Sequence, residues 1–288
     1  MVAARRIALK DTLVVITGGA GHLALACARR FSEHRLLLSD TNPSRLEAAV
    51  QTLRSKGSQV TSMVADITTA AGANDIALTA KHLGGFCTLI HAAGVSPPTP
   101  PETIMAVNLF GTLNVLQAFT PLVQANVKGI VLASLAAHRR LAVQLDDLTL
   151  DPKGAPGELT RQMMERFPMI SPSRLAYAVS KRGTVLQVKK YALLWAQAGA
   201  RLVSVSPGII ADTAMGIQRG PKAPAASDGE HEVRHGLSTE IAAAVWLAAS
   251  AEASLLNGTD ILVDGGYLAT IDTAYPQSKR DDWHELRI

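Results

Sequence analysis

The sequence predicts a single-domain α/β fold with a doubly wound parallel sheet and helices on both faces. Three observations predict this class. The 288 residues are 48% hydrophobic with a mean hydropathy of +0.17, which is enough apolar material for one substantial core. Short apolar runs alternate with longer stretches of helical spacing. The runs are apolar at successive positions, as expected of parallel strands that are covered on both faces.

Seven apolar runs are expected to form the strands, and each ends in small or polar residues. They cover residues 12–19, 35–40, 59–66, 86–94, 129–134, 201–208 and 260–266. Helical spacing follows the first run in ALACARRFSEH and the second in SRLEAAVQTLRSKG. No internal repeat or linker divides the chain, so residues 1–288 are expected to form one dinucleotide-binding and catalytic domain.

Two long segments interrupt the alternation. Residues 139–173 contain four prolines, and residues 209–237 are rich in glycine, proline and alanine. Long irregular connections in a compact domain are usually lids or binding loops. The first segment is expected to form a lid or a subunit interface, with some side chains in the core, and a polar tail follows from residue 270 to 288. The apolar side chains of the first segment are Leu145, Leu148, Leu150, Leu159, Met163, Met164, Phe167 and Met169.

Composition excludes several classes of function. The net charge is +4, but the basic residues are spread along the chain and form no stripe with aromatic residues, so we expect no nucleic acid partner. No uninterrupted run of about 18 apolar residues and no signal peptide are seen, which favours a cytoplasmic protein without a membrane partner. Cys27 and Cys87 are interpreted as buried small hydrophobes. His231 and His235 are expected to be solvated, so no metal site is predicted, and no GxSxG turn supports hydrolysis.

A glycine-rich loop follows the first predicted strand, in TGGAGHLA at residues 17–24. Small residues allow the backbone to approach a pyrophosphate, and the N–H groups at the start of the next helix attract its charge. This position predicts a Rossmann-type dinucleotide site. Asp40 ends the second strand, 19 residues beyond Gly21, where a carboxylate would bind the adenosine ribose and repel a 2′-phosphate. NAD(H) is therefore favoured over NADP(H), although Asp40 could instead cap the helix that begins near Pro43. Asp66 would meet the adenine edge or shape a turn.

Several motifs occur together in a fixed order. They are TGGAG (17–21), HAAG (91–94), VNLFG (107–111), ASLAA (133–137), YAVSK (177–181), SPG (206–208) and VDGG (263–266). Together with Asp40, this set resembles the short-chain dehydrogenase/reductase family over nearly the whole chain, from residue 11 to about 268. The gap of 43 residues between Ser134 and Tyr177, with LAYAVSK, is similar to bacterial hydroxysteroid dehydrogenase/carbonyl reductases.

Tyr177 and Lys181 are four residues apart, so they share one face of the predicted helix. A hydride can leave an alcohol carbon only if the hydroxyl proton also leaves, and an unperturbed tyrosine with a pKa of about 10 is a poor base at neutral pH. A nearby ammonium and an oxidised nicotinamide ring would stabilise the phenolate. The lysine therefore makes the tyrosine usable as an acid/base, and it can also hold the nicotinamide ribose.

The resemblance implies roles for further residues. Ser134 would hydrogen-bond the substrate oxygen, Asn108 would hold a water that relays protons to the lysine, and residues 209–237 would form the substrate loop. The implied cofactor contacts are Thr17, Gly18, Gly21, His22, Leu23, Asp40, Asp66, Ile67, Ala92, Ala93, Gly94, Tyr177, Lys181, Pro207, Gly208, Ile210 and Thr213.

Three positions depart from the family pattern. His22 and Ala24 stand where glycine is common, which brings the loop closer to the spacing of extended family members. His91-Ala92 replaces the asparagine pair that usually opens the fourth-strand motif, and we interpret it as a packing variant rather than a new catalytic base. The cofactor-contacting threonine is expected near Asp212, whereas Thr213 is the threonine present, so this contact is expected to be shifted or lost.

The sequence thus favours an NAD(H)-dependent oxidoreductase that interconverts a secondary alcohol and a ketone, with a bulky apolar or steroid-like substrate. A homodimer or homotetramer is expected. Two alternatives stay open: an NAD(H)-binding sensor or scaffold with little catalysis, and a sugar-nucleotide epimerase. The intact set of serine, tyrosine, lysine and asparagine argues against the sensor. The short sequence after VDGG argues against the epimerase, which would need a larger substrate domain.

Overall fold

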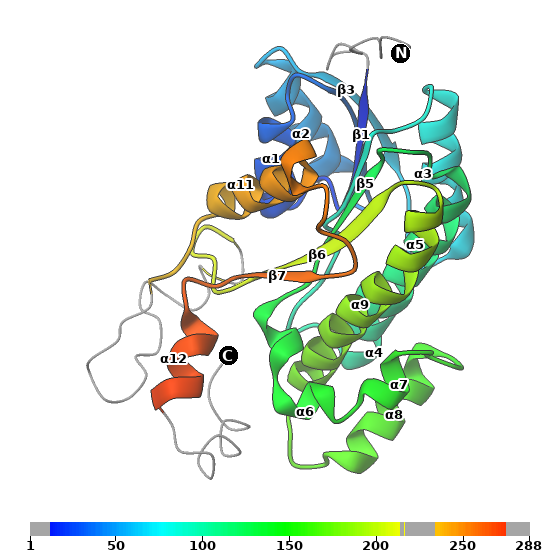
Figure 1. Cartoon of the computed structure of the whole chain (residues 1–288). Helices are drawn as coiled ribbons and strands as arrows, with labels where there is room; N and C mark the ends of the chain where they lie inside the picture. Colours follow the sequence, from blue (N-terminus) through cyan, green and yellow to red (C-terminus); the bar gives the residue numbers. More distant parts are fainter. Residues whose placement is uncertain (1–11, 214–215, 217–233, 275–288) are drawn as a thin grey trace.

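The computed structural model describes residues 12–213, 216 and 234–274. Within these residues, seven parallel strands form one sheet in the order β3-β2-β1-β4-β5-β6-β7. All seven expected strands are present, and the predicted doubly wound class is confirmed (Figure 1). The strands are β1 (Leu13–Thr17), β2 (Arg35–Asp40), β3 (Gln59–Val64), β4 (Thr88–His91), β5 (Lys128–Leu132), β6 (Arg201–Pro207) and β7 (Asp260–Val263).

Helices connect the strands and cover both faces of the sheet (Figure 1). On one face lie α1 (His22–Arg30), α2 (Pro43–Arg54) and α11 (Ser238–Ala249). On the other lie α3 (Ala70–His82), α5 (Gly111–Phe119) and α9 (Pro172–Gln197). The remaining helical segments are α4 (Pro101–Met105), η2 (Ala106–Phe110), η3 (Thr120–Leu122), η4 (Leu135–His138), α6 (Arg140–Val143), α7 (Asp146–Thr149), α8 (Pro156–Arg166), η5 (Ala251–Ala253) and α12 (Tyr267–Ala274).

Each central strand supplies side chains to two separate cores. Val14 and Ile16 of β1 pack with α1, α2 and α11, whereas Leu13 and Val15 pack with α3, α5 and α9. Successive strand residues point to opposite faces, so a run that is apolar at every position is suited to a sheet covered on both sides. This burial explains why the strands could be recognised as continuous apolar runs.

The register brings the ends of the strands to one edge of the sheet. Thr17 of β1 pairs with Ser39 of β2 and with His91 of β4, and β4 continues to β5 through the pair His91 and Val131. The strand order reverses direction at β1 and β4, and a crevice forms beyond the carboxyl ends of strands at such a point. The loops that follow β1 and β4 therefore face a shared crevice.

The segment 139–173 folds into α6, α7 and α8, which pack on α4 and on the first half of α9. Leu145, Leu159 and Met163 are buried here in a third core, as some of this segment's side chains were expected to be. Met169 is 95% exposed and Leu150 is 50% exposed, so these two side chains are available for other contacts. In the described part of the chain, no residue of 139–173 lines the clefts described below.

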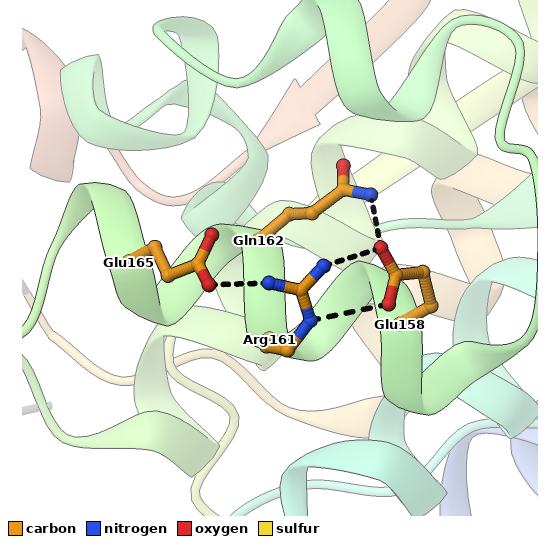
Figure 2. A network of polar contacts seen from close by, with 4 residues as sticks. All are labelled: Glu158, Arg161, Gln162 and Glu165. Atoms are coloured by element: carbon orange, nitrogen blue, oxygen red, sulfur yellow. Dashed lines mark hydrogen bonds and ion pairs between the residues drawn. The ribbon is translucent and has the colours of Figure 1, made fainter.

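The outer face of α8 is polar and carries a connected set of side chains (Figure 2). Arg161 donates to Glu158 through Nε and Nη2, at 3.2 and 2.7 Å, and also contacts Glu165. Gln162 donates to the same Glu158 at 2.8 Å. These contacts are exposed to solvent and add little to stability. They show that α8 turns its charged face outward and its apolar face toward α9.

Among the residues that the structure describes, one helical run, Pro101–Leu122, is long and apolar enough by length and composition to span a membrane. Half of its most apolar window is buried inside the protein. Val115, Leu116 and Phe119 are fully buried in the core beneath the sheet. We therefore interpret this run as a core helix of the fold.

Candidate functional site

Two glycines, Gly18 and Gly21, shape the loop between β1 and α1. Gly18 has a φ of +68°, and a Cβ there would lie 2.5 Å from the Cα of Ala93. Gly21 is the N-cap of α1, and the cap has no side-chain hydrogen bond. The first-turn N–H groups of α1 therefore have no side-chain cap, which is the arrangement that binds phosphate groups at helix N-termini.

The first of two clefts lies beyond β1, β2, β3 and β4, and we call it the cofactor cleft. It has a volume of about 210 Å³. Eight of the predicted cofactor residues line it: Gly18, Gly21, Asp40, Asp66, Ile67, Ala92, Ala93 and Gly94. Sequence reasoning did not single out the others, which are Ser39, Thr41, Arg45, Ala65, Thr68, Val95 and Val107.

Asp40 has both carboxylate oxygens near backbone N–H groups. Oδ2 accepts from Ala20 N at 3.1 Å, and Oδ1 accepts from Asn42 N at 3.0 Å. The N-cap of α2 is Asn42, whose side chain accepts from Arg45 N at 2.9 Å. The alternative in which Asp40 caps this helix is therefore wrong. Asp40 instead braces the glycine loop and lines the cofactor cleft.

Asp66 both shapes a turn and lines the cofactor cleft. Its Oδ1 accepts from Thr68 N at 2.9 Å and from Thr68 Oγ1 at 2.8 Å.

Arg45, in the first turn of α2, donates to Ala20 O at 3.2 Å. The sequence signal that could have identified Arg45 as a cleft residue is its position shortly after Asp40. Because α2 begins directly after β2, its first turn stays close to the loops at the strand ends.

The second cleft, which we call the reaction cleft, lies beyond β5 and β6. It has a volume of about 90 Å³. Seven predicted residues line it: Leu23, Ser134, Tyr177, Pro207, Gly208, Ile210 and Thr213. Ala133, Leu135, Ala136, Ile209 and Gly216 also line it. Ser134 and Tyr177, which are 43 residues apart in the sequence, thus open into one space.

Lys181 contacts residues beside each of the two clefts but lines neither of them. Its side chain is buried, and Nζ donates to Leu132 O at 2.9 Å, directly before the residues of the reaction cleft. A Cβ on Gly94, which lines the cofactor cleft, would lie 3.3 Å from Lys181 Nζ and 3.3 Å from Asn108 Oδ1. Burial lowers the pKa of Lys181 to about 8, since the ammonium loses its hydration.

Asn108 is held by hydrogen bonds on both sides of its amide. Oδ1 accepts from Val95 N at 2.8 Å, and Nδ2 donates to Val95 O at 2.9 Å and to Ser180 Oγ at 3.2 Å. The residue lies in the π-helical segment η2, a distortion that is frequent at functional sites. Its side chain thereby joins the loop after β4 to the turn of α9 that carries Lys181.

Ser134 is nearly buried and precedes η4. Its Oγ accepts from Ala136 N at 3.2 Å, as the side-chain cap of this short helix. This bond uses one lone pair and leaves the hydroxyl proton to donate toward the cleft.

The threonine after the SPG motif contacts its own loop. Thr213 Oγ1 donates to Ile210 O at 2.9 Å, while Asp212 accepts from Ser238 N at 2.8 Å and Ser238 Oγ at 2.6 Å. Asp212 thus fastens the loop to α11, and Thr213 lines the reaction cleft.

Three predicted cofactor residues, Thr17, His22 and Lys181, line neither cleft as the structure describes them. Thr17 is fully buried and bonds to His91, and His22 is exposed at the start of α1.

Cys27 is buried, which raises its pKa to about 12, but Cys87 is only half-buried, contrary to the expectation. In residues 12–213, 216 and 234–274, no cluster of three or more metal-ligating side chains occurs. His231, within residues 217–233 of the expected substrate loop, and residues 275–288 of the tail lie outside the described residues.

Comparison with known proteins places these features in a family. Residues 12–145 match the family described as short chain dehydrogenase, and residues 159–268 match that described as enoyl-(acyl carrier protein) reductase. The chain is 34% identical over 273 residues to the short-chain dehydrogenase/reductase bsc3 of Alternaria brassicicola, covering 90% of this chain and 96% of the relative. It is 29% identical over 213 residues to a 3-alpha-hydroxysteroid dehydrogenase/carbonyl reductase of Comamonas testosteroni, covering 71% and 82%.

Solved structures agree on the fold. Levodione reductase superposes with a TM-score of 0.69 at 23% identity, covering 91% of this chain and 99% of that one. The structure titled gox2181 gives a TM-score of 0.71 at 23% identity, covering 91% and 97%. The chain belongs to the short-chain dehydrogenase/reductase family, whose members are oxidoreductases that act on CH–OH groups with a nicotinamide cofactor.

Proposed function

We propose that this protein is an NAD(H)-dependent oxidoreductase that interconverts a secondary alcohol and a ketone, with Tyr177 as the acid/base. The observation that carries the proposal is that Tyr177 and Ser134 line one cleft, while Lys181 Nζ bonds to Leu132 O beside that cleft and lies next to Gly94 of the cofactor cleft. The relatives named above support the reaction class, and the substrate is assigned only by its chemistry.

The cofactor cleft fits a dinucleotide. A side chain at Gly18 would meet the backbone of Ala93, and one at Gly94 would crowd Lys181 Nζ and Asn108, so both glycines allow the segments that line the cleft to approach closely. A bound nicotinamide cofactor supplies the acceptor or donor of hydride. The residues proposed to hold it are those that line the cofactor cleft, with the N-terminus of α1 against the pyrophosphate.

The preference for NAD(H) follows from Asp40. Its carboxylate lines the cofactor cleft at the end of β2, where it can accept hydrogen bonds from a ribose diol. A 2′-phosphate at the same place would face a like charge, which is unfavourable. Arg45 lines the same cleft, but its guanidinium donates to the loop at Ala20 O.

In the direction of alcohol oxidation, Tyr177 takes the proton of the substrate hydroxyl and Ser134 donates a hydrogen bond to the same oxygen. The Lys181 ammonium favours the phenolate form of Tyr177, since a nearby positive charge stabilises an anion. A pKa of about 8 keeps most of the Lys181 population charged at neutral pH. In ketone reduction, Tyr177 returns the proton and Ser134 polarises the carbonyl.

The proposed substrate is apolar around its reacting group. Leu23, Leu135, Ile209 and Ile210 line the reaction cleft, and none of the described residues that line it carries a charge. A carboxylate or ammonium next to the reacting carbon would be desolvated there without a partner. We therefore propose uncharged secondary alcohols and ketones. A bulky or steroid-like substrate is supported only by the similarity to the 3-alpha-hydroxysteroid dehydrogenase/carbonyl reductase.

We also propose that the protein forms a homodimer or homotetramer. Leu247 of α11 is 64% exposed, Leu262 of the edge strand β7 is 38% exposed, and Leu193 of α9 is 69% exposed. Members of this family are often oligomeric, which supports the proposal, and these leucines are candidates for contact with another copy. Light scattering coupled to size-exclusion chromatography would measure the subunit number, and a monomer across all concentrations would contradict this part.

The test combines cofactor titration with turnover. NADH and NADPH are titrated by fluorescence, and NADH oxidation is followed with cyclohexanone, a long-chain methyl ketone and a steroid ketone. We expect Tyr177→Phe to lower kcat by roughly a thousandfold, in the range of general acid–base catalysis, with NADH affinity almost unchanged. Tyr191→Phe, on the same helix, is the matched control. Full turnover by Tyr177→Phe would reject the role of the tyrosine, and NADH binding without turnover of any ketone would favour a sensor.

A further inference from the structure

A buried histidine at the end of β4 takes no part in the mechanism above. His91 is 1% exposed and stands at the pairing position of Thr17 in β1. Its Nδ1 lies 2.6 Å from Thr17 Oγ1, and its Nε2 lies 3.0 Å from Thr112 Oγ1 in α5. Both ring nitrogens thus have hydrogen-bond partners, and these partners lie on two different elements, β1 and α5.

The hydrogen bonds around His91 define where its proton lies. Thr112 Oγ1 is 2.6 Å from the backbone carbonyl oxygen of Asn108, and a carbonyl can only accept, so Thr112 donates its single proton there. Thr112 must then accept from His91, which places the ring proton on Nε2. A neutral ring has only one N–H, so Nδ1 accepts the hydroxyl proton of Thr17.

The ring is neutral at physiological pH. Burial, with a smaller contribution from the charge of Lys181, lowers the pKa of His91 to about 3. The described structure therefore contains a chain of three hydrogen bonds with one direction, from Thr17 through His91 and Thr112 to the Asn108 carbonyl. We call these four residues the histidine link.

One end of the histidine link, Thr17, lies beside the cofactor cleft, and the other end, Asn108, lies near Lys181. Thr17 immediately precedes Gly18, whose backbone approaches Ala93 at the cofactor cleft. The Asn108 carbonyl also accepts from Thr184 Oγ1 at 3.2 Å, and Thr184 is three residues beyond Lys181 on α9. Movement of β1 relative to η2 would break the link at His91.

We propose that His91, as its neutral Nε2–H tautomer, is a positioning residue that fixes Asn108 relative to the cofactor loop. The residue was interpreted from sequence as a packing variant, and its two paired nitrogens give it this more specific role. The inference rests on the proposed function, because it assigns the effect of His91 to the same reaction.

The tautomer can be measured on the full wild-type chain without a substrate. Protein labelled with ¹⁵N-histidine is studied by long-range ¹H–¹⁵N correlation, and the His91 ring is assigned through its contacts to the methyl groups of Thr17 and Thr112. We expect a single proton on Nε2 from mildly acidic to mildly alkaline pH, with and without NADH. A proton on Nδ1, or a doubly protonated ring, would overturn the proposal.

The kinetic test breaks the link at Thr112 while the histidine stays in place. Thr112→Val keeps the side-chain shape, and we expect kcat for ketone reduction to fall about tenfold, as for supporting residues around other sites, with KM for NADH within about twofold. Thr112→Ser, which restores the hydroxyl, should recover most of kcat. Thr160→Val is the matched control, because Thr160 Oγ1 makes the same bond to the fourth preceding carbonyl at 2.9 Å in α8, away from both clefts.

Unchanged kcat in Thr112→Val, or no recovery in Thr112→Ser, would overturn the positioning role. The tautomer measurement supports or overturns the histidine link even if wild-type protein reduces none of the ketones. That last outcome would instead count against the proposed function.

Discussion

The two clefts differ in how they are built. The cofactor cleft has about 210 Å³ and is formed by loops that directly follow β1, β2, β3 and β4. The reaction cleft has about 90 Å³ and combines the ends of β5 and β6 with α9 and with residues 209–213 and 216. The first is shaped by backbone at strand ends, and the second depends more on side chains from distant segments. Short motifs therefore identify a cofactor class more readily than a substrate.

After the Tyr177→Phe change, the largest effect is expected at Lys181. Lys181→Met removes the charge that supports Tyr177, so kcat should fall by roughly a hundredfold to a thousandfold at neutral pH, measured by NADH oxidation with cyclohexanone. Lys189→Met, an exposed lysine of the same helix, is the control. Equal activity of the two variants would show that Lys181 takes no part in the reaction.

The same variant has a pH-dependent effect on stability. Folded Lys181 has a pKa of about 8, against a reference value of 10.5, so the unfolded chain binds more protons between these two values. The free energy of unfolding of wild type, relative to Lys181→Met, should therefore rise with pH across this window, by on the order of 3 kcal/mol at most. Urea unfolding of both proteins at neutral pH and above pH 10.5 measures this change. A constant difference would contradict the burial of a charged lysine.

The next largest effect is expected at the glycine loop. Gly18→Ala forces an alanine into a positive φ and against Ala93, so NADH affinity should fall by about a hundredfold or more. Gly57→Ala is the control, because Gly57 also has a positive φ, +89°, but no atom lies within 4 Å of its added Cβ. Titration by NADH fluorescence compares the two variants. If both bind NADH as wild type does, the proposed place of the pyrophosphate is wrong.

A smaller effect is expected from the charge of Asp40. Asp40→Asn keeps the size of the side chain but removes the repulsion of a 2′-phosphate, so the ratio of NADPH to NADH affinity should rise roughly tenfold. Parallel titrations with the two cofactors give this ratio. An unchanged ratio would leave Asp40 as a brace for Ala20 N and would remove the basis for the NAD(H) preference.

The smallest effect is expected at Asp66. Asp66→Asn keeps an oxygen that can accept from Thr68, so the turn and the melting temperature should persist. If the carboxylate also meets the adenine, NADH affinity should fall by about threefold, the value of one modest hydrogen bond. Calorimetric titration has the precision for this difference. Identical affinities would assign Asp66 to the turn alone.

The fold was predictable because its signals are local. Each strand is a short apolar run, and the loop at Gly18 directly follows β1 in the sequence. Contacts between distant positions were not predictable in the same way. Thr17 was expected to touch the cofactor but bonds to His91, 74 residues away, because which face of a strand end a side chain occupies depends on its neighbours. Arg45 was missed because PSRLEAAV on its own resembles the start of a surface helix, and only its short distance in sequence from Asp40 indicates a place at the cleft.

The helix that carries the proposed acid/base belongs to two cores. Leu175, Ala176 and Val179 pack with α4, α6 and α8, whereas Val188 and Trp195 pack beneath the sheet. Arg182 fastens the junction through two bonds to Asp146 of α7, at 2.7 and 2.6 Å. Local melting of α6, α7 and α8 would thus release the turn of α9 around Tyr177 while the sheet persists. Heating should inactivate the enzyme before it denatures the β-structure.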